Sequence, residues 1–137
     1  MLPDVEVLVV AHLRDTSAVT AITDRIGTEH PDDFTDPWVK VQTLDEQQAS
    51  RPALHLVAPL VQVDVYAGAP VAGVPSKREV SELARTVREA LVALPTGAHT
   101  DAVVTASTAA LRPLPDTTFD PARQRYIITC SLTLHAA

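Results

Sequence analysis

Cysteine, glycine and asparagine are scarce or missing in this chain of 137 residues, and each shortage excludes a class of site. The single cysteine, Cys130, cannot form an internal disulfide, which is typical of proteins that fold in a reducing compartment. The four glycines never form the GxGxxG, P-loop or GxSxG patterns that bind phosphates or expose a nucleophile. Without asparagine there is no N-glycosylation sequon.

Aromatic residues are also few. They make up 4% of the chain, whereas hydrophobic residues make up 46%. The core must therefore consist of valine, leucine, alanine and isoleucine, and the many valines at alternating positions favour a β-sheet. A chain of this length can bury roughly two-thirds of its unfolded surface, so we expect a single domain over residues 1–137.

Basic residues are outnumbered by acidic ones: 11 against 17, for a net charge of −6. This balance argues against a dedicated nucleic-acid binder, because phosphate contacts need clustered lysine and arginine. No apolar run approaches the length of a membrane span. The N-terminal segment lacks a basic region and is interrupted by Asp4 and Glu6, so we expect no signal peptide.

Helical periodicity is strongest over residues 77–94. One apolar stripe contains Val80, Leu83, Ala84, Val87, Leu91 and Leu94. Ser76 and Glu79 have the spacing of a capping box, and the Pro95-Thr96-Gly97 sequence predicts the end of the helix. Apolar residues at helical spacing also predict a helix over residues 4–14, although the valines there leave a strand as the alternative. A short helix is predicted over residues 17–22.

Strand patterns account for most of the remaining chain. They lie at residues 25–29, 38–44, within 54–66, within 102–111 and at 125–134, with loops at 30–37, 45–52, 68–75 and 112–123. We expect Pro59 to divide the strand within 54–66, and we expect Gln62, Asp64 and Tyr66 to form its polar face. The prediction is an α+β domain with a mostly antiparallel or mixed sheet of four to five strands, packed by helix 77–94 and an N-terminal helix.

Each candidate metal or nucleophile has a simpler structural explanation. The five histidines never form an HExxH pair. Glu29, His30 and the acidic residues after them could bind a divalent ion, but they lack the glycine and distal glutamate of a calcium loop, which favours a solvated turn. Cys130 could be a nucleophile, but its place on the apolar face of a strand favours an inert core position.

The same reasoning applies to the charged candidates. Asp64 could act as a general base, but an exposed or salt-bridged sheet position is favoured. Arg112, Arg123 and Arg125 could bind phosphate, but a solvated loop is favoured. We therefore predict no catalytic residue, no cofactor and no metal.

Three large aromatic residues lie at predicted strand ends or in a predicted loop: Phe34, Trp38 and Tyr66. Aromatic side chains at such places often anchor a protein–protein interface. Core packing is the alternative for Trp38.

The order of these segments resembles the tail terminator proteins of bacteriophages with long flexible tails. Residues 24–37, followed by Val39-Lys40-Val41, are similar to the first strand, acidic-proline turn and second strand of that family. Residues 61–67, VQVDVYA, are similar to its central strand. The helix at 77–94, with Ala84-Arg85 and Ala90-Leu91, and the strand at 126–134 follow in matching order, so the likeness spans nearly the whole chain.

The resemblance implies a structural virion protein and no enzyme. Such a protein forms a ring, usually a hexamer, on the last disc of the tail tube, stops tube polymerisation and provides the head–tail joining surface. Its partners would be other copies of itself, the tail tube protein and a head-completion or connector protein. DNA would pass through the bore without specific binding, and no membrane would be involved. It would assemble in the host cytoplasm and reside at the tail–head interface of the virion.

For the contacts themselves we predict the loops at 45–52 and 68–75 and six residues: Phe34, Asp45, Glu46, Arg51, Tyr66 and Arg123. Two alternative functions are open at this point. One is another head–tail connector or minor tail protein. The other is a small α+β enzyme or ligand-binding domain, which would need a concave pocket with convergent polar groups that the sequence does not indicate.

Overall fold

The computed structural model describes residues 4–31, 36–48, 56–68, 76–99, 102–118 and 123–136. In chain order the elements are α1 (Val5–Asp15), α2 (Ser17–Thr20), β1 (Ile26–Gly27), β2 (Trp38–Gln48), β3 (Val57–Tyr66), α3 (Ser76–Val92), the 3-10 helix η2 (Leu94–Thr96), β4 (Ala102–Pro113) and β5 (Arg125–Ala136). This composition confirms the predicted α+β class.

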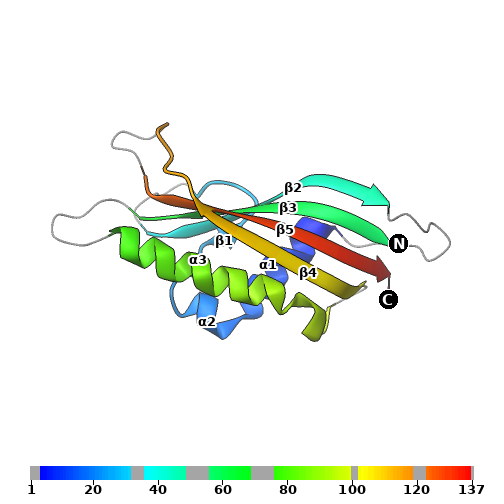
Figure 1. The fold of residues 1–137 in the computed structure, drawn as a ribbon. Helices are drawn as coiled ribbons and strands as arrows, with labels where there is room; N and C mark the ends of the chain where they lie inside the picture. The colour runs from blue at the N-terminus through cyan, green and yellow to red at the C-terminus, as the bar shows by residue number, and fades with distance from the viewer. Residues whose placement is uncertain are drawn as a thin grey trace.

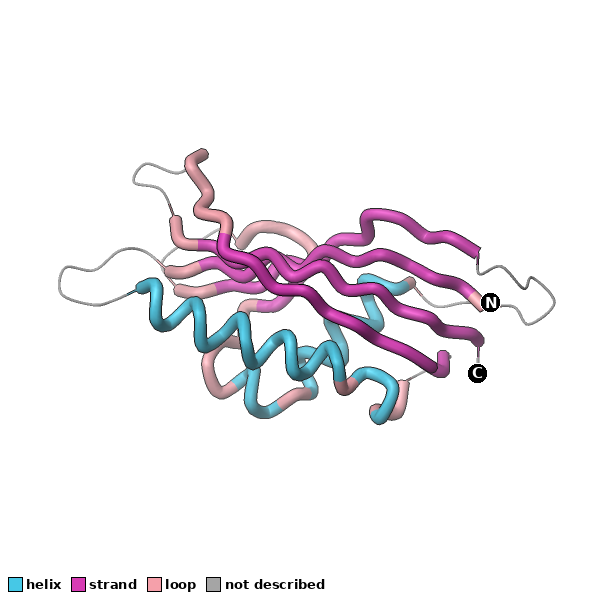
Figure 2. The backbone as a smooth tube through the Cα atoms, viewed as in Figure 1, coloured by secondary structure: helices cyan, strands magenta, loops and turns pink. Residues whose placement is uncertain are grey.

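The five strands form one mixed sheet in the order β1-β2-β3-β5-β4. β1 pairs with β2 in parallel, and every other neighbouring pair is antiparallel. The helices α1, α2 and α3 all lie on the same side of this sheet (Figures 1 and 2). We call the side that they cover the helix face and the opposite side the outer face.

α1 is a helix, and the alternative of a strand is wrong. Its start is set by Asp4, whose Oδ1 accepts hydrogen bonds from the backbone N–H groups of Glu6 and Val7, at 2.9 and 3.4 Å. These bonds satisfy two of the donors that a helix N-terminus leaves open, and this offsets the weak helix propensity of the valines. The stripe that includes Leu8 and Leu13 is buried against the rest of the core.

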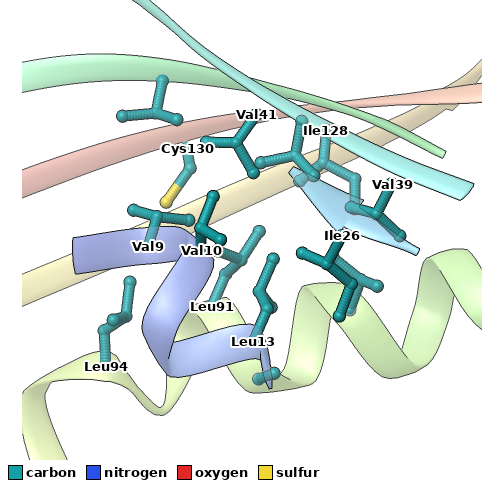
Figure 3. Packing of buried hydrophobic residues seen from close by; sticks show 14 of the residues in the cluster. Val9, Val10, Leu13, Ile26, Val39, Val41, Leu91, Leu94, Ile128 and Cys130 are labelled. Carbon is teal, nitrogen blue, oxygen red and sulfur yellow. The ribbon is translucent and has the colours of Figure 1, made fainter. Parts of the chain in front are cut away.

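All six residues of the predicted stripe have no exposed surface; five belong to α3, and Leu94 belongs to η2, because α3 ends at Val92 and not at residue 94 as predicted. α3 packs mainly against β4 and β5 and is followed by the 3-10 helix η2, which contains Pro95 and which we did not predict. Figure 3 shows side chains of α1, α3 and the sheet meeting in one core, among them Val9, Leu13, Leu91, Val41, Ile128 and Cys130. Burying each of the larger aliphatic side chains contributes roughly 1.5–3 kcal/mol.

Two predictions about the strands are wrong. β2 continues through Gln48, although we expected a loop from residue 45, because a β-bulge between Thr43 and Asp45 lets the ladder to β3 continue. Pro59 does not divide β3. It pairs with Glu46 of β2, and only the ladder to β5 is interrupted, between Val57 and Leu60. A proline removes a single N–H, so a strand can keep one of its two ladders across it.

The residues that we predicted to form the polar face of β3 are more buried than expected. Asp64 is 4% exposed and Tyr66 is 2% exposed, although we expected Asp64 at an exposed or salt-bridged position. The Asp64 carboxylate instead accepts a hydrogen bond from Gln62 Nε2 at 2.9 Å. Asp64 and Tyr66 are therefore buried although they lie on the outer face, which local alternation does not predict.

Candidate interaction surfaces

Tyr66 and Trp38 pack against each other at one end of the outer face. Their rings stack with centroids 4.5 Å apart and an interplanar angle of 7°. The His30 ring meets both edge-on, with centroid distances of 5.7 Å to Tyr66 and 6.2 Å to Trp38. Tyr66, which we predicted as an interface residue, therefore lies inside the folded chain, and Trp38 takes the core position that was its alternative.

Residues 114–118, which follow β4, are joined to Tyr66 and to the start of β5 by a largely buried polar cluster of Asp116, Arg125 and Tyr66. The Tyr66 hydroxyl donates to Asp116 Oδ2 at 3.2 Å and accepts from Arg125 Nη1 at 3.2 Å. The guanidinium of Arg125 also lies 3.8 Å from the Asp116 carboxylate and donates through Nε to Leu114 O. Arg125 thus has a structural role in place of the solvated one we predicted.

The electrostatics of this cluster follow from its burial and its bonds. Burial by itself would raise the pKa of Asp116, but hydrogen bonds from Thr118 Oγ1 and N and from Tyr66, together with the charge of Arg125, outweigh it and lower the pKa below 3.8. Burial raises the pKa of Tyr66 above 10.0 despite its bond to Arg125. The cluster therefore consists of a stable carboxylate and a neutral phenol, with no group suited to proton transfer at neutral pH.

Among the other predicted interface residues, those that the structure describes, Arg123, Asp45 and Glu46, lie at two different ends of the sheet. Arg123 pairs through its backbone with Asp116, with N···O distances of 2.8 and 3.0 Å, at the base of the β4–β5 connection. Asp45 and Glu46 belong to β2 at the opposite end of the sheet, where Asp45 pairs with Leu60. Phe34 and Arg51, the loop at 68–75 beyond Gly68, and the loop at 45–52 beyond Gln48 lie outside the described residues.

The outer face carries small and polar side chains toward the end where Asp45 lies. A shallow hollow of about 390 Å³ is lined there by Asp45, Ala58, Pro59, Leu60, Ala106, Thr108, Ser131, Leu132 and Thr133. Its lining comes from β2, β3, β4 and β5, and none of its members is a histidine, cysteine, lysine or arginine. Such a surface offers area for packing against another protein.

The two edges of the sheet differ in how their backbone groups are satisfied. On the β1–β2 side, the Glu6 carboxylate of α1 accepts a hydrogen bond from Thr43 N at 2.8 Å. Arg14 of α1 donates through Nε and Nη2 to Ile26 O at 3.1 and 2.6 Å. The sequence analysis did not predict these roles of Glu6 and Arg14. No local pattern could have indicated them, because, for example, Glu6 and Thr43 are 37 positions apart. β4, whose first ten residues are uncharged, forms the other edge.

The remaining candidates have structural roles. His12 and His99 lie beside a hollow of about 370 Å³, and their Nε2 atoms are 2.7 and 2.6 Å from Ala90 O and Leu94 O. Cys130 is fully buried, and burial raises its thiol pKa although Ser107 Oγ lies 3.5 Å away.

In the described ranges, no three histidine, cysteine or acidic residues are grouped as metal ligands. No helix in the described part of the chain is long and apolar enough to cross a membrane.

Comparison with protein families identifies this arrangement. The model of the family described as tail completion protein gp17 matches residues 7–130, which run from the first turns of α1 to the middle of β5. The chain belongs to this family. Membership in the tail completion family makes it a structural tail protein, and confirms the resemblance on which the sequence prediction rested.

The fold of this tail completion protein also occurs in a virion structure. A chain from the virion of a native gene transfer agent particle superposes with a TM-score of 0.72 and covers 96% of this chain and 94% of its own length. The two sequences are 14% identical, so the likeness concerns the fold. No curated protein matches the chain.

Proposed function

We propose that this tail completion protein forms a closed ring of six copies on the last disc of the tail tube. There it stops tube polymerisation and presents the surface to which a head-completion or connector protein binds. The observation that carries the proposal is the family match across residues 7–130, which covers almost the whole domain. The protein acts through assembly and not through catalysis, and it resides at the tail–head interface.

The geometry supports an assembly role in two ways. Toward the end where Asp45 lies, the outer face carries small and polar side chains, and its hollow is lined by no histidine, cysteine, lysine or arginine, which suits packing against another protein more than catalysis. Identical subunits that meet through two different surfaces either close into a ring or polymerise without end, and a protein that stops growth has to close. The net charge of −6 also disfavours adhesion to DNA passing through the bore.

The test is genetic, in the phage or particle that encodes the chain. Deleting the gene should give unjoined heads and tails of abnormal length in electron micrographs, and supplying the gene in trans should restore both joining and length. Purified protein, alone or added to purified tail tubes, should form rings visible by negative-stain microscopy. Infectious particles with tails of normal length in the absence of the gene would refute the proposal. Normal tails that fail to join heads would instead indicate another head–tail connector.

A further inference from the structure

The two lateral sides of the subunit carry different helices. Across the sheet, in the order β1-β2-β3-β5-β4, α1 packs on β1 and β2, whereas α3 packs mainly on β4 and β5. Both helices belong to the helix face (Figure 1). A second copy placed beside the sheet in the same orientation therefore brings its α3 next to α1 of the first, because the β4 side of one copy then meets the β1 side of the other.

The exposed surface of α3 divides into a basic flank and an acidic flank. Ser107 Oγ of β4 donates to Leu91 O at 2.7 Å, so the Leu91 side of the helix lies toward β4. Ala90 O lies 2.7 Å from His12 Nε2, so the Ala90 side lies toward α1. Helical spacing assigns the exposed residues of α3 to these two sides. On the Leu91 side are Arg85, Arg88 and Val92, and on the Ala90 side are Glu79, Glu82 and Glu89.

The basic flank presents groups that have no partner in the described part of the chain. There, the guanidinium groups of Arg85 and Arg88 form no hydrogen bond and no ion pair. Val92 lies one turn beyond Arg88 and is 50% exposed. Arginine side chains cover apolar surface with their stems while their heads bind carboxylates. The flank therefore fits an apolar surface that has free carboxylates beside it.

A surface of this kind lies at the β1 side of the subunit. A hollow of about 630 Å³ opens there between α1 and β1, and its apolar lining comes from Val7, Val10, Ala11 and Gly27. Val7 is 61% exposed. Asp15 and Glu29 also line the hollow, and among the described residues their carboxylates have no hydrogen-bond or ion-pair partner. The guanidinium of Arg14, which lies nearby, is bonded to Ile26 O, so both carboxylates are available to a cation from outside.

We propose that the basic flank of α3 in one copy docks into the hollow between α1 and β1 of the next copy. Its two arginines pair with the two carboxylates of the hollow, and Val92 packs against Val7. A second copy is the occupant because the two surfaces are complementary in charge and lie on opposite sides of the same subunit. Such a contact is heterologous and repeats from copy to copy, which is how rings are built. The inference rests on the proposed ring function and names the surfaces through which neighbouring subunits meet.

Complementary charge reversals test the docking. One variant carries Arg85→Glu and Arg88→Glu, and the other carries Asp15→Lys and Glu29→Lys. Each alone should need a roughly tenfold higher protein concentration than the parent to form rings, because like charges meet at every contact. An equimolar mixture should recover the ring yield of the parent, since each reversed surface then meets its complement. Rings are counted by negative-stain microscopy, with and without purified tail tubes.

Two further variants separate docking from folding. Gly27→Trp should block the hollow and abolish rings while the domain still folds, because a Cβ at Gly27 would meet no atom within 4 Å. Glu89→Lys, a reversal on the acidic flank of the same helix, is the matched control and should assemble like the parent. Circular dichroism and melting curves confirm that each variant folds.

Parent-like rings from both reversed variants would overturn the inference and leave the ring function standing, and so would a mixture that recovers no rings. Reversed variants that form rings but no longer bind tail tubes would overturn it too, and would assign the two surfaces to the tube protein. Absence of rings from the parent protein, with or without tail tubes, would refute the ring function and the docking together.

Discussion

Asp116 is the residue whose charge has the clearest structural consequence, because it connects the β4–β5 segment to Tyr66 and Arg125. Its carboxylate accepts bonds from Thr118 and Tyr66 in a position that is 8% exposed. Since the folded-state pKa lies below 3.8, the carboxylate stabilises the fold fully above the unfolded-state pKa. That contribution disappears as the pH falls through the folded-state value.

Asp116→Asn should therefore lower the free energy of unfolding at pH 7 by about 1–3 kcal/mol, the usual cost of losing hydrogen bonds to a buried charge. The variant should also lose less stability than the parent between pH 7 and pH 3. Urea unfolding at a series of pH values measures both effects. The control is Glu82→Gln, whose carboxylate is 65% exposed beside Arg78. Parallel pH curves for parent and Asp116→Asn would show that this carboxylate does not contribute to acid sensitivity.

Cys130 illustrates a residue whose chemistry is suppressed by its surroundings. It is fully buried with a raised thiol pKa, so we expect no reaction with a thiol reagent at pH 7 until the protein unfolds. Cys130→Ala should cost about 1 kcal/mol of stability, as for removal of a small buried group, and should leave assembly unchanged. Labelling kinetics with and without urea, together with microscopy of the variant, check this. Rapid labelling of the native protein would contradict it.

At the scale of elements, α3 is the part on which the fold most depends. Its own Leu83 and Leu91 side chains are fully buried. Leu91→Ala should cost about 2–5 kcal/mol, since it removes core contacts and leaves a cavity. Leu83→Asp or Leu91→Asp should leave the protein insoluble, because an unpaired charge would be buried.

Arg85→Asp, on the exposed face of the same helix, is the matched control for these variants and should stay soluble. Chemical unfolding of Leu91→Ala and the soluble fraction of the aspartate variants provide the measurements. Aspartate variants that fold with unchanged melting temperatures would show that the stripe of α3 is not what holds the sheet and the helices together.

At the scale of the whole molecule, two charged residues predicted as subunit contacts should affect assembly. Glu46 lies near the end of β2, and Arg51 belongs to the predicted contact loop at 45–52. Glu46→Lys and Arg51→Glu should weaken ring formation while the domain still folds, because a reversed charge meets the wrong neighbour at an interface.

Sedimentation and negative-stain microscopy measure the loss of rings in these two variants, and circular dichroism confirms folding. Glu89→Lys, a charge reversal on the exposed face of α3, is the control and should assemble normally. Equal ring yields for all three variants would place the subunit contacts elsewhere on the molecule.

Much of the secondary structure was determined by the sequence itself, because its signals are local. The stripe of α3, the cap that Asp4 provides for α1 and the alternation of Val61, Val63 and Val65 each involve residues a few positions apart. These patterns predicted the order of the elements and the α+β class. The match to the tail family rests on the same order and spacing, so the sequence also carried the family resemblance.

The arrangement of surfaces was decided only by the tertiary structure, because it depends on contacts between distant residues. Alternation could not predict that Asp64 and Tyr66 would be buried, since Tyr66 is covered by Asp116 from 50 positions away. Nor could it predict that Glu6 caps Thr43, or that one cross-sheet row runs from Asp45 to Thr108. Local patterns show which face of a strand is apolar. Which strands lie at the edges of the sheet depends on how strands far apart in sequence pair, so only the folded chain shows it.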